Sequence, residues 1–131
     1  MIKPRMLIVD DEDDIRTSFA DHLLARLDCD IDTRANGAEA IRDLDSREYH
    51  VLLLDLHMPG VDGLTVLAHA KQKYPGIIAL VVTRLDDPVK TKTVEDLGAV
   101  YVSKPVTLKA LQFILERELE RKGCFQYKKA G

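Results

Sequence analysis

The sequence contains no tryptophan, only two cysteines and no long hydrophobic run. Cys29 and Cys124 lack the spacing of metal ligands, so we expect both thiols to be buried or without a role. The longest apolar runs are much shorter than the roughly 20 residues that span a bilayer. The apolar run behind the basic N-terminus is too short for the core of a signal peptide. These absences predict a cytoplasmic protein that does not bind membranes.

The sequence also has no excess of basic residues over acidic ones. The chain carries 19 lysines and arginines against 22 aspartates and glutamates, which gives a net charge of −3 at pH 7. A nucleic-acid-binding surface usually needs a clear basic excess, so this domain is not expected to bind nucleic acid directly. With 131 residues, of which 46% are hydrophobic and 31% charged, the sequence fits one globular domain with one core.

The chain does contain a repeated alternation of short apolar runs and helix-like segments. Apolar residues recur at helical spacing between and after the runs, which predicts an α/β domain with helices on both faces of one parallel sheet. The segment 88–97 has few apolar residues, so we expect a weakly anchored helix that is able to shift. The expected strands, of which the second is typical of a sheet edge, are residues 6–9, 30–34, 51–55, 77–82 and 100–102.

Polar side chains stand where four of these strands end. Asp10 and Asp11 follow the first strand, Asp55 ends the third, Thr83 follows the fourth and Lys104 follows the fifth. Because the carboxyl ends of parallel strands share one edge of the sheet, we expect these residues to lie close together. Ligands of open α/β sheets bind at that edge, so the combination of acids, hydroxyl and lysine predicts a functional site there.

Short motifs surround these residues in a fixed order. They are Ile8-Val9-Asp10-Asp11, Leu54-Asp55-Leu56-His57-Met58-Pro59-Gly60, Asp62-Gly63, Val82-Thr83, Leu97-Gly98-Ala99, and Tyr101 with Lys104-Pro105. In this order and spacing, the motifs resemble the receiver domain of two-component response regulators over residues 6–119. The resemblance implies a five-stranded parallel sheet in the flavodoxin-like order 2-1-3-4-5, with five helices on its two faces.

By this resemblance, Asp55 is the phosphoacceptor, which takes a phosphoryl group from the phosphohistidine of a sensor histidine kinase. The implied cofactor is Mg²⁺, bound directly by Asp11 and Asp55, through water by Asp10, and by the backbone carbonyl of His57. The residue types suit this ion, because clustered carboxylates repel one another and Mg²⁺ is a hard cation that prefers oxygen ligands. The imidazole of His57 is not expected to bind the metal.

The resemblance also implies how phosphorylation is sensed. Lys104 and Thr83 are expected to contact phosphoryl oxygens, and the Lys104-Pro105 peptide bond is expected to be cis. Thr83 would move toward the phosphoryl group, and Tyr101 would follow into the vacated space. The surface expected to change comprises the helix 88–97, the strand that contains Tyr101 and the last helix.

One residue departs from the family pattern. Arg84 follows Thr83, where the family usually has alanine or glycine. The arginine could narrow access to the site, slow phosphotransfer or dephosphorylation, contact the phosphoryl group, or point to solvent, and the sequence leaves these alternatives open. The loop of residues 85–88 is also slightly shorter than the family pattern.

The main hypothesis is a phosphorylatable receiver domain over residues 1–122, with residues 123–131 as a tail or the start of a linker. We do not expect an enzyme, beyond slow loss of the domain's own phosphoryl group. The expected partners are a sensor histidine kinase, an output domain or downstream protein, and a second copy of the chain on phosphorylation. The sequence does not distinguish a stand-alone receiver from the N-terminal fragment of a DNA-binding transcription regulator.

Three other classes fit less well. A degenerate receiver that binds partners without phosphorylation is disfavoured by the complete set of acids, hydroxyl and lysine, although Arg84 supports it. A Mg²⁺-dependent phosphohydrolase typically has a second acid two residues after its aspartyl nucleophile, where this chain has His57. A flavin-binding module needs a phosphate-cradling loop after the first strand, where this chain has an acidic run.

Overall fold

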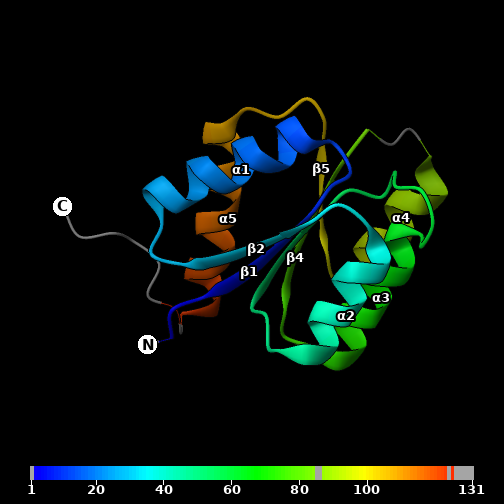
Figure 1. The fold of residues 1–131 in the computed structure, drawn as a ribbon, viewed down its shortest axis with the longest axis horizontal. Helices are drawn as coiled ribbons and strands as arrows, with labels where there is room; N and C mark the ends of the chain where they lie inside the picture. Colours follow the sequence, from blue (N-terminus) through cyan, green and yellow to red (C-terminus); the bar gives the residue numbers. More distant parts are fainter. Residues whose placement is uncertain (1, 85–86, 124, 126–131) are drawn as a thin grey trace.

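Five strands and five helices alternate within the described residues 2–84, 87–123 and 125 of the computed structural model (Figure 1). The strands are β1 (Arg5–Val9), β2 (Asp30–Arg34), β3 (Val51–Leu54), β4 (Ile78–Thr83) and β5 (Val100–Ser103). The helices are α1 (Asp13–Arg26), α2 (Gly37–Ser46), α3 (Gly63–Lys73), α4 (Pro88–Asp96) and α5 (Leu108–Lys122). All neighbouring strands are parallel, in the order β2-β1-β3-β4-β5, so the predicted fold class and strand order are confirmed.

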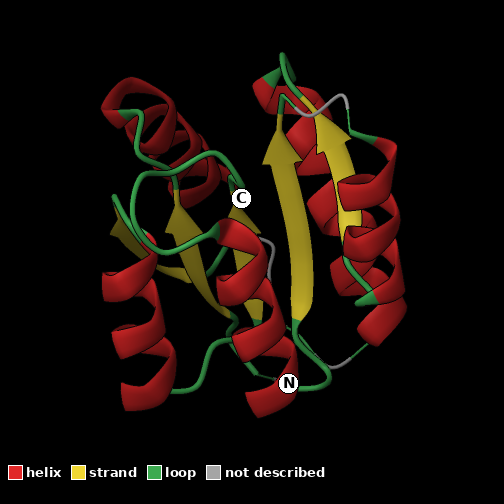
Figure 2. Ribbon diagram, turned by 90° about the vertical axis from the view of Figure 1, so that its right-hand side faces the viewer, coloured by secondary structure: helices red, strands yellow, loops and turns green. Residues whose placement is uncertain are grey.

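Helices cover both faces of the sheet, as Figures 1 and 2 show. Helices α1 and α5 pack on one face, and α2, α3 and α4 pack on the other. The side chains of a strand alternate between faces, so Met6 and Ile8 of β1 join the first core, and Leu7 and Val9 join the second. With both faces of the sheet buried, the ends of the strands are left for function.

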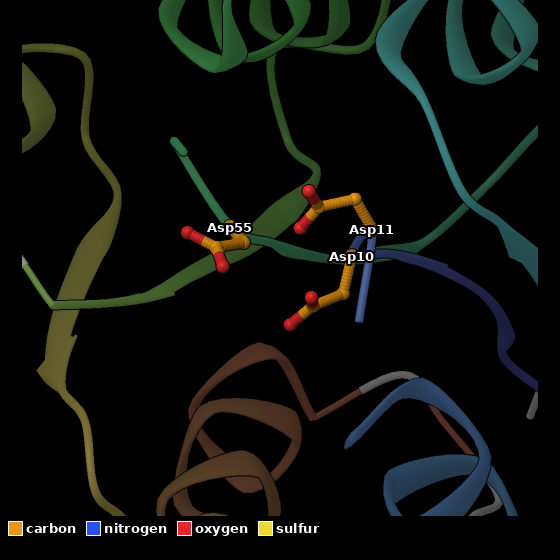
Figure 3. Close-up of side chains that lie close together, drawn as sticks. All are labelled: Asp10, Asp11 and Asp55. Carbon is orange, nitrogen blue, oxygen red and sulfur yellow. The ribbon is translucent and has the colours of Figure 1, made fainter. Parts of the chain in front are cut away.

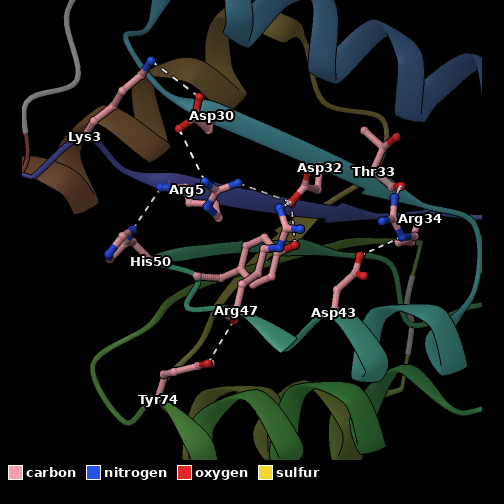
Figure 4. Close-up of polar contacts among 11 residues, drawn as sticks. Lys3, Arg5, Asp30, Asp32, Thr33, Arg34, Asp43, Arg47, His50 and Tyr74 are labelled. Atoms are coloured by element: carbon pink, nitrogen blue, oxygen red, sulfur yellow. Dashed lines mark hydrogen bonds and ion pairs between the residues drawn. The ribbon is translucent and has the colours of Figure 1, made fainter. Parts of the chain in front are cut away.

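The edge strand β2 makes several polar contacts (Figure 4). Its residues are only half-buried, whereas those of β3 and β4 are buried. Arg5 of β1 places Nη2 3.8 Å from Asp30 Oδ2 and Nη1 3.7 Å from Asp32 Oδ2. The Tyr49 hydroxyl donates to Asp32 at 2.6 Å, and burial together with this bond raises its pKa. The prediction of an edge strand is confirmed. Because exposed ion pairs contribute little stability, we attribute its position mainly to pairing with β1.

Helix α4 is held by few apolar contacts. Its N-cap residue, Asp87, accepts a hydrogen bond from the amide of Val89 at 3.0 Å, and Pro88 is its first residue. Val94 is the one buried residue of the helix. This small number of buried apolar residues agrees with the weak anchoring expected for the segment 88–97. The ability of α4 to shift stays a prediction. The shortened loop before it includes residues 85 and 86, which lie outside the described residues.

Gly63 allows the start of α3 to approach the end of β3. A Cβ atom added at Gly63 would lie 2.6 Å from Leu56 Cα and 2.9 Å from the carbonyl oxygen of Asp55. Real Cβ atoms essentially never come this close to backbone atoms, so only glycine fits without a shift. The close approach fixes the loop that follows Asp55 against the sheet.

The chain beyond α5 is not loose at Phe125. Gly123 ends α5 with a left-handed backbone, at φ 71°. Phe125 is buried, forms a parallel β-bridge with Ile2, and meets the ring of His50 edge to face, with centroids 5.4 Å apart. Phe125 falls within residues 123–131, which were predicted to be a tail or the start of a linker, but its ring is part of the core that α1 and α5 form with the sheet. Residues 124 and 126–131 lie outside the described residues, and the predicted domain boundary remains untested.

Two further expectations concern cysteine and membranes. Cys29 is buried, as predicted, and Cys124 lies outside the described residues. Among the helices of the described residues, none is both long and apolar enough to cross a membrane.

Replacing Gly63 with alanine is expected to lower the free energy of unfolding by about 1–3 kcal/mol, because the added methyl group forces the backbone to move. Urea denaturation measures this effect. Gly76→Ala is the matched control, because nothing lies within 4 Å of a Cβ atom added there. The control should be neutral or stabilising by about 0.4–1 kcal/mol. Equal stability of the two variants would contradict the close approach of α3 to β3.

Candidate functional site

Asp10, Asp11 and Asp55 meet at the carboxyl edge of the sheet (Figure 3). The first two follow β1 and the third follows β3, and these strands pair directly, with Val9 opposite Leu54. The amide of Asp55 extends the pairing by donating to the carbonyl of Val9 at 3.0 Å. As a result, one carboxylate oxygen from each acid lies within 4.8 Å of the others. The strand order therefore brings the three acids together.

Donors from neighbouring residues orient the two buried carboxylates. Asp10 and Asp55 are only 3% and 4% exposed. Asp10 Oδ1 accepts the backbone N–H of Glu12 at 2.9 Å. Asp55 Oδ1 accepts the backbone N–H of His57 at 3.0 Å and the hydroxyl of Thr83 at 2.8 Å. Asp55 is thus fixed by its own loop and by the neighbouring strand β4.

Lys104 is the counter-ion of both buried acids. Its Nζ donates to Asp10 Oδ2 at 2.9 Å and to Asp55 Oδ2 at 2.8 Å, and Glu12 Oε1 lies 3.7 Å away. The Lys104-Pro105 peptide bond is cis, as predicted. Burial disfavours the charged lysine, but the hydrogen bonds to Asp55 and Asp10 and the negative charges of these acids together outweigh burial and raise the pKa of Lys104. Burial raises the pKa of Asp10, more than the Glu12 amide and Lys104 lower it.

The acidic cluster has the donors that a hard divalent cation requires. Asp11 is exposed, so the cluster of Asp10, Asp11 and Asp55 is open to solvent on one side. Carboxylate oxygens suit Mg²⁺, which keeps several waters when it is bound by only a few protein ligands. The imidazole Nε2 of His57 lies 3.1 Å from the carbonyl oxygen of Arg84, a contact that accounts for this ring without a metal. The individual ligand roles, including the carbonyl of His57, stay predictions.

The two predicted switch residues lie on adjacent strands. Thr83 ends β4, is fully buried, and already donates its hydroxyl to Asp55. Tyr101 of β5 is half-buried and packs against the core formed with α2, α3 and α4. The hydroxyl of Thr83 would therefore change its partner, rather than move far, if Asp55 carried a phosphoryl group. The coupling of Tyr101 to that change stays a prediction.

Arg84 directly follows Thr83 and is exposed. It lines a cavity of about 220 Å³ with five other residues from α1 and from the segment after β5: Ile15, Phe19, Lys104, Pro105 and Val106. This position bears on the alternatives left open by the sequence, because it places the arginine beside the lysine that contacts Asp55.

The sequence did not single out two charged residues that support the site. Arg16 Nη1 donates to the carbonyl oxygen of Asp10 at 2.7 Å and so holds the turn between β1 and α1. Glu12 provides the amide that orients Asp10 and a carboxylate near Lys104. Charged residues are common near the start of a helix, so the residue types of Arg16 and Glu12 did not indicate a role in the site. Only the acidic run after the first strand pointed to this loop.

The comparisons with known proteins agree on one family. The sequence model of the response regulator receiver domain matches residues 6–116. Among curated proteins, the DNA-binding transcriptional regulator NtrC of Escherichia coli (strain K12) is 33% identical over 113 residues, which are 86% of this chain and 24% of that protein. The chain thus spans about a quarter of the length of the relatives of this kind that it matches.

Solved structures give the same fold. A CheY-like receiver domain protein from Methanospirillum hungatei JF-1 superposes with a TM-score of 0.86 at 24% identity, covering 94% of this chain and 98% of that one. At that identity the likeness shows the fold alone. The BeF3-activated receiver domain of DrrB gives a TM-score of 0.82 at 25% identity, covering 92% of this chain and 100% of that one. DrrB is a response regulator of Thermotoga maritima.

Replacing Lys104 with methionine is expected to destabilise the metal-free protein by about 3–5 kcal/mol, because Asp10 and Asp55 would remain buried without their counter-ion. Mg²⁺ should raise the Tm of this variant more than that of the wild type, because the ion would supply the missing positive charge. Thermal unfolding with and without Mg²⁺ measures both effects.

The matched control is Lys109→Met, which removes the same charge at an exposed position of α5. It should leave both the Tm and its response to Mg²⁺ unchanged. If Lys104→Met also unfolds at the wild-type temperature and gains no extra stability from Mg²⁺, the lysine does not hold the acids together.

Proposed function

This chain belongs to the response regulator receiver domain family, and we propose that it is a phosphorylatable switch of a two-component system, with Asp55 as its phosphoacceptor. The observation that carries the proposal is the surroundings of Asp55. Its carboxylate accepts bonds from the hydroxyl of Thr83 and the ammonium of Lys104, and it lies beside two further acids, Asp10 and Asp11. A nucleophile, donors for phosphoryl oxygens and a set of metal ligands are thus combined in one place.

The proposed reaction is transfer from a phosphohistidine of a sensor histidine kinase. A carboxylate oxygen of Asp55 attacks phosphorus, the phosphorus–nitrogen bond breaks, and the imidazole nitrogen of the kinase keeps the electron pair. The protein mainly has to position the carboxylate and stabilise charge on the transferring group. Mg²⁺, held by Asp10, Asp11, Asp55 and the carbonyl of His57, would neutralise charge on the phosphoryl oxygens.

Lys104 and Thr83 would then transfer their hydrogen bonds from the carboxylate to phosphoryl oxygens. The phosphoryl group would carry about −1.5 to −2 charges at neutral pH, in place of the single charge of the free carboxylate. Hydrogen bonds to charged groups contribute about 1.5–3 kcal/mol each. Because Thr83 and Lys104 already donate to the free carboxylate, only the difference in strength between the old and the new bonds would contribute to the roughly 5.5 kcal/mol that shifts a two-state equilibrium from 1:99 to 99:1.

The proposed readout surface comprises α4, β5 and α5. Helix α4 supports this choice, because Val94 is its one buried residue and little apolar contact opposes its movement. Tyr101 of β5 lies beside β4, with Val81 as its partner in the sheet, so it is close to Thr83 at the strand's end. A change at Thr83 has a short path to this surface.

The proposed partners are a sensor histidine kinase and an output domain or downstream protein. The chain covers only part of its longer relatives, one of which is a DNA-binding regulator, and this supports an output domain in the same polypeptide. Dimerisation on phosphorylation, a cytoplasmic location and the absence of catalysis beyond slow dephosphorylation stay predictions. A second candidate function is partner binding without phosphorylation, and the exposed Arg84 beside Lys104 is the observation that favours it.

Acetyl phosphate or beryllofluoride, added with Mg²⁺, is expected to shift the backbone NMR signals of Thr83, Tyr101 and residues 88–97. The expected cause is the exchange of partners by Thr83 and Lys104. Asp55→Asn should abolish these shifts, because the amide cannot accept the group.

Asp21→Asn is the matched control, because it removes one acid from an exposed position of α1. This variant should respond as the wild type does. Wild-type spectra that do not change with either reagent would overturn the phosphoacceptor role and favour partner binding alone.

A further inference from the structure

We propose that Arg84 is a second phosphoryl-binding cation of this site and acts beside Lys104 on the group that Asp55 accepts. The inference rests on the proposed phosphoacceptor role of Asp55. It assigns a binding function to a position where the family pattern usually has a small residue.

The backbone places Arg84 next to the reacting carboxylate. It directly follows Thr83, whose hydroxyl lies 2.8 Å from Asp55 Oδ1, and adjacent Cα atoms are only about 3.8 Å apart. Its carbonyl oxygen lies 3.1 Å from His57 Nε2, and the amide of His57 donates to the same oxygen of Asp55. Arg84 is therefore connected to Asp55 from two sides, through β4 and through the loop after β3.

Arg84 and Lys104 line the same cavity, of about 220 Å³, between α1 and the segment after β5. Lys104 in turn donates to Asp55 Oδ2 at 2.8 Å, so a residue that lines this cavity also contacts the carboxylate that would carry the phosphoryl group. Arg84 is exposed, so its long side chain is free of close packing that would prevent it from turning toward that carboxylate.

The charge of the site calls for another cation. Lys104 contacts Asp10, Asp55 and Glu12, and Asp11 joins the cluster with the first two, so the acids outnumber the lysine. A bound divalent cation together with Lys104 balances three of these four acids. On phosphorylation, the about −1.5 to −2 charges of the phosphoryl group replace the single charge of the Asp55 carboxylate, so the site becomes more negative by up to about one charge. The planar guanidinium of arginine offers paired N–H donors that match two phosphoryl oxygens.

The same contact should operate with a small phosphodonor. When acetyl phosphate reacts, an oxygen of Asp55 attacks phosphorus, the bond from phosphorus to the acetyl oxygen breaks, and acetate leaves with the electron pair. The phosphoryl oxygens are present before and after transfer, so Arg84 is expected to tighten binding of the donor. It is also expected to tighten binding of beryllofluoride, which takes the place of the phosphoryl group on Asp55.

The test is a titration of the wild type, Arg84→Ala and Arg84→Lys with beryllofluoride at saturating Mg²⁺, followed by the NMR signal of the Thr83 amide. Arg84→Ala is expected to weaken binding about tenfold, which corresponds to about 1.4 kcal/mol. The concentration of acetyl phosphate at half-maximal rate should rise by a similar factor. Arg84→Lys should recover part of the affinity, because it keeps the charge without the planar fork.

Arg26→Ala is the matched control, because it removes an exposed arginine from the last turn of α1, a helix of 14 residues whose first turn adjoins the site. It should bind beryllofluoride as the wild type does. Unchanged or tighter binding by Arg84→Ala, or an equal loss in Arg26→Ala, would overturn the role of Arg84 and leave that of Asp55 intact. If the wild type binds no more beryllofluoride than Asp55→Asn, the phosphoacceptor role itself fails, and this inference fails with it.

Discussion

The ammonium group of Lys104, held between the buried carboxylates of Asp10 and Asp55, is the interaction on which the site depends. Two carboxylates withdrawn from water would repel each other and would lose their hydration. Lys104 follows β5, which is separated from β3 by β4, so its side chain crosses the end of β4 to reach both acids. One lysine thereby connects the ends of β1, β3 and β5.

This arrangement also explains why the site is suited to accept a phosphoryl group. The donors of Thr83 and Lys104 are already directed at Asp55, at 2.8 Å each. New oxygens on Asp55 would meet donors that are in place, so little reorganisation is needed beside the reacting atom. A larger conformational change would have to involve an element with few buried contacts. Helix α4 is such an element, because Val94 is its one buried residue.

Much of the fold and of the site follows from local sequence patterns. The apolar runs predicted the strands, and the parallel sheet then required Asp10, Asp55, Thr83 and Lys104 to share one edge. The strand order itself came from the resemblance to a family, because periodicity does not determine which strands are neighbours. The acids, hydroxyl and lysine were found from their positions at strand ends.

Other features depend on contacts between distant residues and left no local signal. Phe125 is buried through contacts with Ile2 and His50, which are far away in the sequence. The residues next to Phe125 in the sequence gave no sign of these contacts, so it was assigned to a tail. The bond between the His57 imidazole and the carbonyl of Arg84 joins two loops whose spacing only the folded sheet defines. The cavity that Arg84 and Lys104 line together likewise depends on the folded arrangement of β4, β5 and α1.

The central claim is that Asp55 forms an acyl phosphate, and its chemistry offers a direct test. Borohydride reduces an acyl phosphate to an alcohol, so a phosphorylated aspartate is converted to homoserine and can be located by peptide mass spectrometry. After incubation with acetyl phosphate and Mg²⁺, the account predicts homoserine at position 55 and at no other aspartate. Reduction at another acid, or at none, would contradict it.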